Sequence, residues 1–118
     1  MVEKEEVIKF LKEFKKYSQD KFTFIQRKKN LLTLSYLGIT IGEAKNIIYS
    51  LTYENYSAGP TKDMDNPGSK IWVFGAIIEN MEVYIKLSAD FNSGYAKCIS
   101  FHIAKNKLVY PLKKRGIK

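Results

Sequence analysis

Three apolar segments in the second half of the chain, separated by turn residues, constrain the fold most strongly. They span residues 71–78, 81–88 and 95–104, with turns at 79–80 and 93–94 between them. Within 81–88 apolar and polar side chains alternate, which is the two-residue period of a strand with one buried face. Turns this short join antiparallel neighbours. The pattern therefore predicts a meander of three antiparallel strands.

The first half of the chain has helical periodicity instead. Residues 3–17 repeat apolar side chains every three or four positions, with lysines and glutamates between them, which predicts an amphipathic helix. A short strand is expected at 21–26 and a short helix at 31–37, closed by Gly38 at its C-terminal cap. A second long helix is predicted at 41–51, because the threonine and glutamate at its start have capping-box spacing.

Residues 52–70 have no period and contain Gly-Pro and Asn-Pro-Gly turns, so a long loop is predicted there. A last short strand is expected at 108–110. The order of the elements indicates an α+β fold in which N-terminal helices pack on one face of a small antiparallel sheet. The length fits a single domain over 1–118, with 110–118 as a basic tail whose composition is compatible with disorder.

Cysteine and histidine each occur once, as Cys98 and His102, which excludes an internal disulfide, a paired-cysteine metal site and a histidine cluster. We therefore expect no metal and no cofactor. The acidic N-terminus is unlike a signal peptide, and the longest apolar run, 71–78, is far shorter than the roughly 18 residues that span a bilayer. The sequence predicts a cytoplasmic protein with no membrane partner.

The net charge of +8 is concentrated in the last third of the chain. Residues 1–85 hold twelve basic and eleven acidic side chains, whereas 86–118 hold eight basic and one acidic. A second basic cluster is the run Arg27-Lys28-Lys29. Such a field attracts polyanions, of which nucleic acid is the commonest in cytoplasm. Lysine-rich tails also keep small proteins soluble, so charge alone leaves both interpretations open.

One face of the meander is expected to collect polar side chains. Tyr84 and Lys86 point away from the apolar set of their strand, and Ser100 and His102 point the same way from the next strand. The register that joins the two apolar sets would put Tyr84 near Ser100, Lys86 near Cys98 and His102 near a glutamate. In the preceding strand a glycine would lie beside Tyr84 and leave room for a ligand.

These groups suit RNA cleavage without a metal. A base takes the proton of the ribose 2′-hydroxyl, a cation stabilises charge on the phosphoryl oxygens, and an acid protonates the leaving 5′-oxygen. His102 is the side chain best suited to proton transfer near neutral pH, Lys86 would supply the cation, and Tyr84 could donate a hydrogen bond or stack on a base.

Each of these residues also has a structural interpretation. A lone histidine in a strand is more often a hydrogen-bonded structural residue, and tyrosine and lysine are ordinary on an exposed sheet face. Cys98 is more simply a small, partly buried residue than a nucleophile. The residues thus leave open an RNA-cutting face, a non-catalytic RNA-binding or ribosome-associated module, and a subunit interface.

Four segments resemble the MqsR family of toxins from bacterial toxin-antitoxin modules. They are the stretch IIYSLTYENY at 47–56, the pair Ile71-Trp72, VYIKL at 83–87 and CISFH at 98–102. The resemblance implies the RelE-like α+β ribonuclease fold and the activity of an mRNA interferase. It also implies mRNA and a cognate antitoxin as partners, with the ribosome as a further candidate.

Under this resemblance Tyr84 and Lys86 match the family's strand motif, and His102 stands where the family has a catalytic lysine. A family lysine and glutamine are replaced here by Ala58 and Val73. We therefore predict a metal-independent endoribonuclease whose catalytic residues are His102, Lys86 and Tyr84. Further RNA contacts are predicted from six residues: Lys62, which could take the part of the missing lysine, Tyr56, Ser100, Arg27, Lys28 and Lys105.

Overall fold

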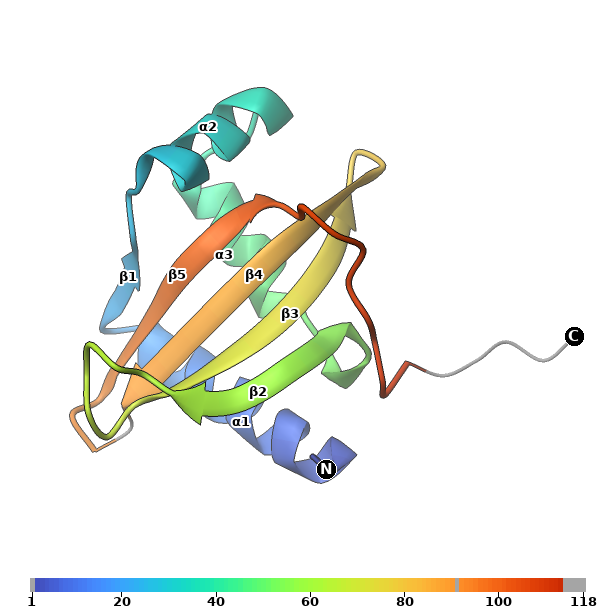
Figure 1. Ribbon diagram of the computed structural model, residues 1–118. Coiled ribbons are helices and arrows are strands. Elements are labelled where there is room, and N and C mark those ends of the chain that lie inside the picture. Colours follow the sequence, from blue (N-terminus) through green and yellow to red (C-terminus); the bar gives the residue numbers. More distant parts are fainter. Residues whose placement is uncertain (1, 91, 114–118) are drawn as a thin grey trace, which may run out of the picture.

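The predicted meander forms the centre of the computed structural model, which describes residues 2–90 and 92–113 (Figure 1). Strand β3 (Lys70–Ile78) pairs antiparallel with β4 (Met81–Asp90), and β4 pairs antiparallel with β5 (Tyr95–Ile103). Glu79 and Asn80 both have positive φ, 51° and 65°, as the tight turns of β-hairpins require. The three strands and their first turn are confirmed.

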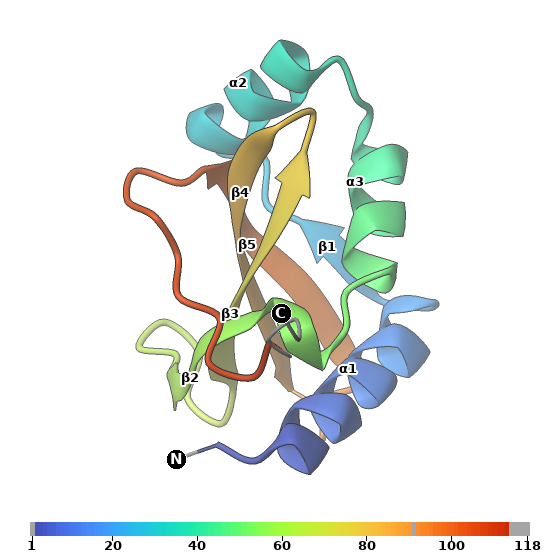
Figure 2. The ribbon, with the colours of Figure 1, turned by 90° about the vertical axis from the view of Figure 1, so that its right-hand side faces the viewer.

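The helices precede the meander in the chain. The described elements before β3 are α1 (Lys4–Ser18), β1 (Phe22–Phe24), α2 (Lys28–Leu37), α3 (Ile41–Tyr49), a 3₁₀ turn η1 (Tyr53–Asn55) and β2 (Tyr56–Lys62). The five strands form one sheet in the order β1-β5-β4-β3-β2, with α1 and α3 on one face (Figure 2). The α+β class is confirmed. The sheet is mixed rather than antiparallel, because β1 runs parallel to β5.

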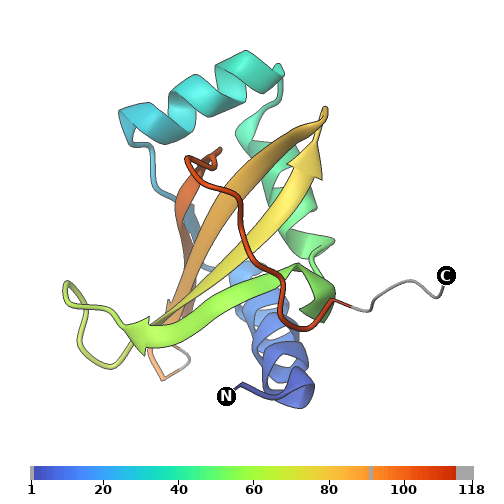
Figure 3. The same ribbon diagram turned by 45° about the vertical axis from the view of Figure 1, so that its right-hand side comes forward.

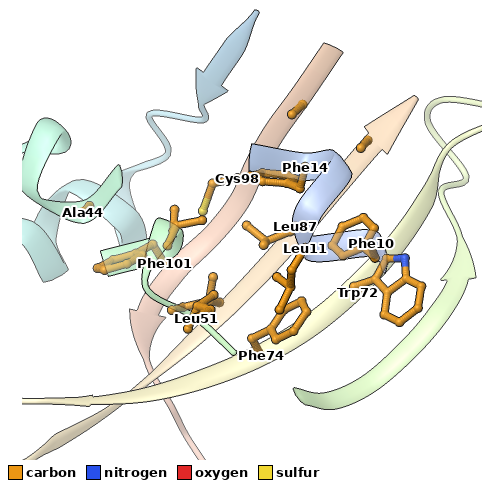
Figure 4. Close-up of a cluster of buried hydrophobic side chains, with 14 of the residues drawn as sticks. Phe10, Leu11, Phe14, Ala44, Leu51, Trp72, Phe74, Leu87, Cys98 and Phe101 are labelled. Atoms are coloured by element: carbon orange, nitrogen blue, oxygen red, sulfur yellow. The ribbon is translucent and has the colours of Figure 1, made fainter. Parts of the chain in front are cut away.

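The core lies between α1, α3 and the inner face of the sheet (Figure 4). Helix α1 buries its apolar stripe there, and the ring of Phe10 stacks on Trp72 with centroids 4.7 Å apart and planes 15° apart. Phe74, Leu87 and Phe101 are fully buried beneath the helices. The strand residues that alternate with this apolar set consequently point to the opposite face of the sheet. Within the described residues, no helix is long and apolar enough to cross a bilayer.

Both predicted helix signals are present. Thr40 Oγ1 accepts a hydrogen bond from the backbone N–H of Glu43 at 3.0 Å, and Glu43 Oε1 accepts one from the backbone N–H of Thr40 at 2.9 Å, so α3 begins with the expected capping box. Gly38 closes α2 in the left-handed conformation, with φ 70° and ψ 33°. Helix α2 begins at Lys28, three residues earlier than predicted, and this moves the basic cluster onto its first turn.

The two glycines that flank this junction predict stability changes of opposite sign. Gly38→Ala is expected to lower the free energy of unfolding by about 1 kcal/mol, because a Cβ disfavours the left-handed conformation. Gly42→Ala, within α3, is expected to raise it by about 0.5–1 kcal/mol, since its Cβ would make only an ordinary contact with Thr40, at 3.7 Å. Urea denaturation of both variants checks this pair, and changes of the same sign would contradict it.

The predicted loop at 52–70 is wrong over its first half. Residues 56–62 form the edge strand β2, paired with β3 through two register shifts. Pro60 and Gly59 gave this segment the composition of a loop, yet proline is compatible with an edge strand at an irregularity. The strand predicted at 108–110 is also absent, because that segment crosses the face of the sheet instead of pairing with it (Figure 3).

The predicted register of β4 and β5 is wrong by two residues. Tyr84 pairs with His102 and Lys86 pairs with Ser100, whereas Leu87 pairs with Cys98, so the register skips residue 99. This bulge reverses the alternation of β5. Cys98, expected on the polar face, is therefore fully buried in the core. Desolvation raises the pKa of its thiol, which agrees with a structural role.

Candidate active site

A pocket of about 370 Å³ lies on the sheet face opposite α1 and α3. Its lining comes from β4, β5, the start of α2 and the segment that follows β5. No acidic side chain is among the described residues that line it. Its lining includes five cationic residues: Arg27, Lys29, Lys86, Lys105 and Lys107. The pocket is therefore electrostatically suited to an anionic ligand.

His102 and Tyr84 are neighbours within the pocket. They face each other across β4 and β5, and their rings stack with centroids 5.2 Å apart and planes 19° apart. The Nδ1 atom of His102 lies 3.0 Å from the carbonyl oxygen of Ile103. Because a carbonyl can only accept a hydrogen bond, this contact assigns the proton of the neutral ring to Nδ1. Nε2 is then left with a lone pair and can accept a proton.

The surroundings of His102 favour its neutral form. Desolvation lowers the pKa of the imidazole below its usual 6.5, although the bond to Ile103 acts in the opposite direction. The positive charges of Lys29, Arg27 and Lys86 lower this pKa further. At neutral pH the ring is therefore uncharged and Nε2 is available as a base.

Tyr84 and Lys86 complete the predicted catalytic set. Desolvation raises the pKa of the Tyr84 phenol, so this group keeps its proton at neutral pH and can donate it. The Nζ atom of Lys86 lies 5.9 Å from the centroid of the Tyr84 ring. An imidazole, a phenol and an ammonium group from adjacent strands thus line one pocket, which is the placement that the sequence predicts.

Arg27 and Ser100 form a linked pair at the α2 side of the pocket. Arg27 stands at the N-terminal cap of α2 and donates a hydrogen bond from its guanidinium to Ser100 Oγ at 3.3 Å. Ser100 lines the pocket but is only 1% exposed. Its predicted role as a direct RNA contact is therefore corrected: the hydroxyl holds Arg27 and is not itself presented at the surface.

The basic cluster reaches the pocket through Arg27, as predicted, and through Lys29 in place of the predicted Lys28. Arg27 and Lys29 line it, whereas Lys28 is exposed and outside the lining. Because the helix was expected to begin only at residue 31, the sequence carried no information on the direction of these side chains. Because α2 begins at Lys28, successive side chains point in different directions around the helix, and Lys29 faces the pocket while Lys28 does not.

Two predicted RNA contacts are not brought to the pocket. Tyr56 is 6% exposed and packs edge-on against Trp72 and Phe74 in the core, with its hydroxyl donating to the Gly59 carbonyl. Lys62 is exposed at the far end of β2, which is separated from β4 by β3. Both predictions assumed a loop free to fold toward the site, and the bulged strand removes that freedom.

The glycine expected beside Tyr84 is Gly75, and its pairing with Tyr84 is confirmed. The space above it is not open to a ligand, however. A Cβ at Gly75 would collide with the Tyr110 hydroxyl and with Leu108. The glycine therefore admits the C-terminal segment of this chain rather than a ligand.

Among the described residues, no three His, Cys, Asp or Glu side chains are grouped so that they could hold a metal ion. Comparisons of the chain with protein-family models, with curated proteins and with solved structures gave no match. The resemblance to the MqsR family therefore stays a prediction from the sequence. The α+β fold and the cationic pocket with its histidine define the site on which a function can be argued.

Proposed function

We propose that this protein is an endoribonuclease that cleaves single-stranded RNA by attack of a ribose 2′-hydroxyl on the adjacent phosphate, without a metal. One observation carries the proposal. The imidazole of His102, whose Nδ1 faces the Ile103 carbonyl, stacks on the Tyr84 phenol in a pocket lined by five cationic side chains. General bases and anion-stabilising cations are the two requirements of this chemistry.

In the proposed reaction, His102 Nε2 takes the proton of the 2′-hydroxyl while the 2′-oxygen forms a bond to phosphorus. The bond from phosphorus to the 5′-oxygen breaks, and the Tyr84 phenol gives its proton to that oxygen. Lys86 and Arg27 stabilise the charge on the non-bridging phosphoryl oxygens. The products are a 2′,3′-cyclic phosphate and a 5′-hydroxyl. Solvent then returns the proton from the imidazolium to the phenolate.

The resemblance to MqsR toxins extends the proposal to biology. Under this resemblance the substrate is mRNA, the protein acts in the cytoplasm, and its partners are a cognate antitoxin and, as a further candidate, the ribosome. A neighbouring protein with an acidic segment would suit the cationic pocket.

Expression of the wild-type protein is expected to arrest growth. The arrest should be lost in His102→Ala but kept in the surface variant Lys12→Gln on α1.

Cleavage is expected to depend on pH through His102. Because its pKa is lowered, the base is deprotonated at neutral pH, and kcat/KM should fall only as the pH drops below about 6.5. Lys29→Gln removes a charge that lowers this pKa, so the acidic limb of its profile should move to higher pH. A wild-type limb centred above neutrality, or an unmoved limb in the variant, would contradict the assignment.

The activity itself is tested by incubating the purified protein with a single-stranded RNA in EDTA and analysing the product ends. We expect strand scission with 2′,3′-cyclic phosphate ends. Tight binding with no scission would favour the rival function, a non-catalytic RNA-binding or ribosome-associated module. Scission that EDTA abolishes would contradict the metal-independent mechanism.

A further inference from the structure

The chain that follows β5 crosses the open face of the sheet as a strap, defined here as residues 104–112. Figure 3 shows it passing in front of β3 and β4, on the face opposite α1. The sequence predicted a basic tail beginning at residue 110. Tyr110 is instead held against the sheet by a hydrogen bond to Glu82, whereas residues 114–118 of that predicted tail lie outside the described residues.

A single carboxylate on β4 anchors the strap. Glu82 Oε1 accepts a hydrogen bond from the backbone N–H of Leu108 at 2.9 Å, and Oε2 accepts one from the Tyr110 hydroxyl at 2.7 Å. The backbone N–H of Ala104 also donates to the Glu82 carbonyl at 2.9 Å. Desolvation and the bond to Glu82 both raise the pKa of Tyr110, so the phenol remains a donor at neutral pH.

Packing supports the same position. Leu108 and Tyr110 occupy the space that Gly75 leaves above β3, and Leu112 packs against the hydrophobic core. The strap is therefore fixed at Ala104 and again from Leu108 onward. Between these two fixed points the side chains of Lys105 and Lys107 are exposed and line the pocket that holds His102.

We propose that the strap is a phosphate clamp for single-stranded RNA, in which Lys105 and Lys107 bind the backbone beside the scissile linkage and Glu82 and Tyr110 are positioning residues. This inference rests on the proposed function and extends it. The clamp supplies two of the five cations that line the pocket. Arg27 and Lys29, at the start of α2, would bind the RNA strand from the opposite side of the pocket. The reacting groups of β4 and β5 would then lie between the strap and α2.

The clamp predicts a defined salt dependence. Each phosphate contact to a single strand contributes about 0.7 to the slope of log binding constant against log salt. Losing both lysine contacts should therefore reduce the magnitude of the slope by about 1.4. A residue with a merely structural role would change stability without changing this slope, so the measurement separates the two possibilities.

The experiment measures binding of a fully 2′-O-methylated single-stranded oligonucleotide, which cannot be cleaved, over a range of salt concentrations. Lys105→Gln/Lys107→Gln should lose about 1.4 from the slope. Glu82→Ala, which removes both side-chain anchors while leaving every pocket-lining residue intact, should lose a comparable amount. Tyr110→Phe, which keeps the ring and removes one hydrogen bond, should fall between Glu82→Ala and the wild type.

Lys9→Gln/Lys12→Gln is the matched control, because it removes the same charge from exposed positions on α1, across the sheet. Its slope should equal that of the wild type. A wild-type slope in Lys105→Gln/Lys107→Gln or in Glu82→Ala overturns the clamp, even if His102→Ala abolishes cleavage. A reduced slope in both, in a protein that never cleaves RNA, supports the clamp and overturns only the proposed chemistry.

Discussion

Replacement of His102 by alanine is expected to lower the rate of RNA cleavage by about 100- to 10,000-fold, the range that a positioned general base contributes. The imidazole is the group whose Nε2 is left unprotonated by the bond from Nδ1 to the Ile103 carbonyl. Neither Lys86 nor Tyr84 can replace it, since an ammonium carries no lone pair and desolvation keeps the phenol protonated. Single-turnover cleavage of a labelled RNA measures the effect.

The same variant carries its own control. His102 is half-buried and is not part of the hydrophobic core, so His102→Ala should keep the cooperative thermal unfolding of the wild type. Added imidazole should restore part of the lost rate, because a diffusible base can occupy the space that the ring leaves. A folded His102→Ala protein with more than a tenth of the wild-type rate would show that His102 is not the base.

The second large effect is expected at Asn30, which is fully buried on α2. Its Nδ2 donates to the carbonyls of Ile25 and Ile99 at 2.8 and 2.9 Å, and its Oδ1 accepts from the N–H of Phe101 at 3.0 Å. Asn30→Ala would remove these bonds from the buried N–H of Phe101 and from the half-buried carbonyls of Ile25 and Ile99, each loss costing about 1–3 kcal/mol. We expect the free energy of unfolding to fall by at least about 3 kcal/mol.

Urea denaturation of Asn30→Ala measures this loss, with Asn46→Ala at an exposed position of α3 as the comparison, expected to change stability by no more than about 0.5 kcal/mol. A loss below about 1 kcal/mol in Asn30→Ala would contradict the role assigned to its side chain. The position matters for the site as well, because Asn30 bonds the two residues that flank Ser100 in β5 and so ties α2 to the strand that carries His102.

The parts of the fold that could be predicted are those with local signals. Helix α3 begins at a capping box contained within four residues, and the hairpin of β3 and β4 turns at two residues that both adopt positive φ. Strand β2 was missed because Gly59 and Pro60 are typical of loops, whereas its pairing with β3 depends on partners that lie 8–18 residues away in the chain.

The register error has a similar origin. In the run Cys98-Ile99-Ser100-Phe101, apolar residues occur on both alternating sets, so the sequence does not reveal where the face changes. The bulge at residue 99 is fixed by Asn30, which lies 69 residues from Ile99 in the chain. A contact over such a distance leaves no local periodicity to detect.

The strand residues of the candidate site could be predicted, whereas Lys29 on α2 and Lys107 on the strap could not. Tyr84 and Lys86 share a face because they are two residues apart in one strand, and His102 joins them even after the two-residue shift, since an even shift keeps side chains on the same face. The position of Lys29 in the pocket depends on where α2 begins, and the position of Lys107 depends on the anchoring of the strap by Glu82. Neither is encoded by local spacing.

The most direct test of the central claim compares two oligonucleotides that differ by one oxygen atom. One contains a single ribonucleotide at the cleavage site within an otherwise 2′-O-methylated strand, and the other contains the 2′-deoxy nucleotide there. The proposed attack by the 2′-hydroxyl predicts that the wild-type protein, in EDTA, cuts only the first and leaves a 2′,3′-cyclic phosphate. Equal cleavage of both strands by the wild-type protein would contradict it. So would a result in which the wild type and His102→Ala alike cut neither strand.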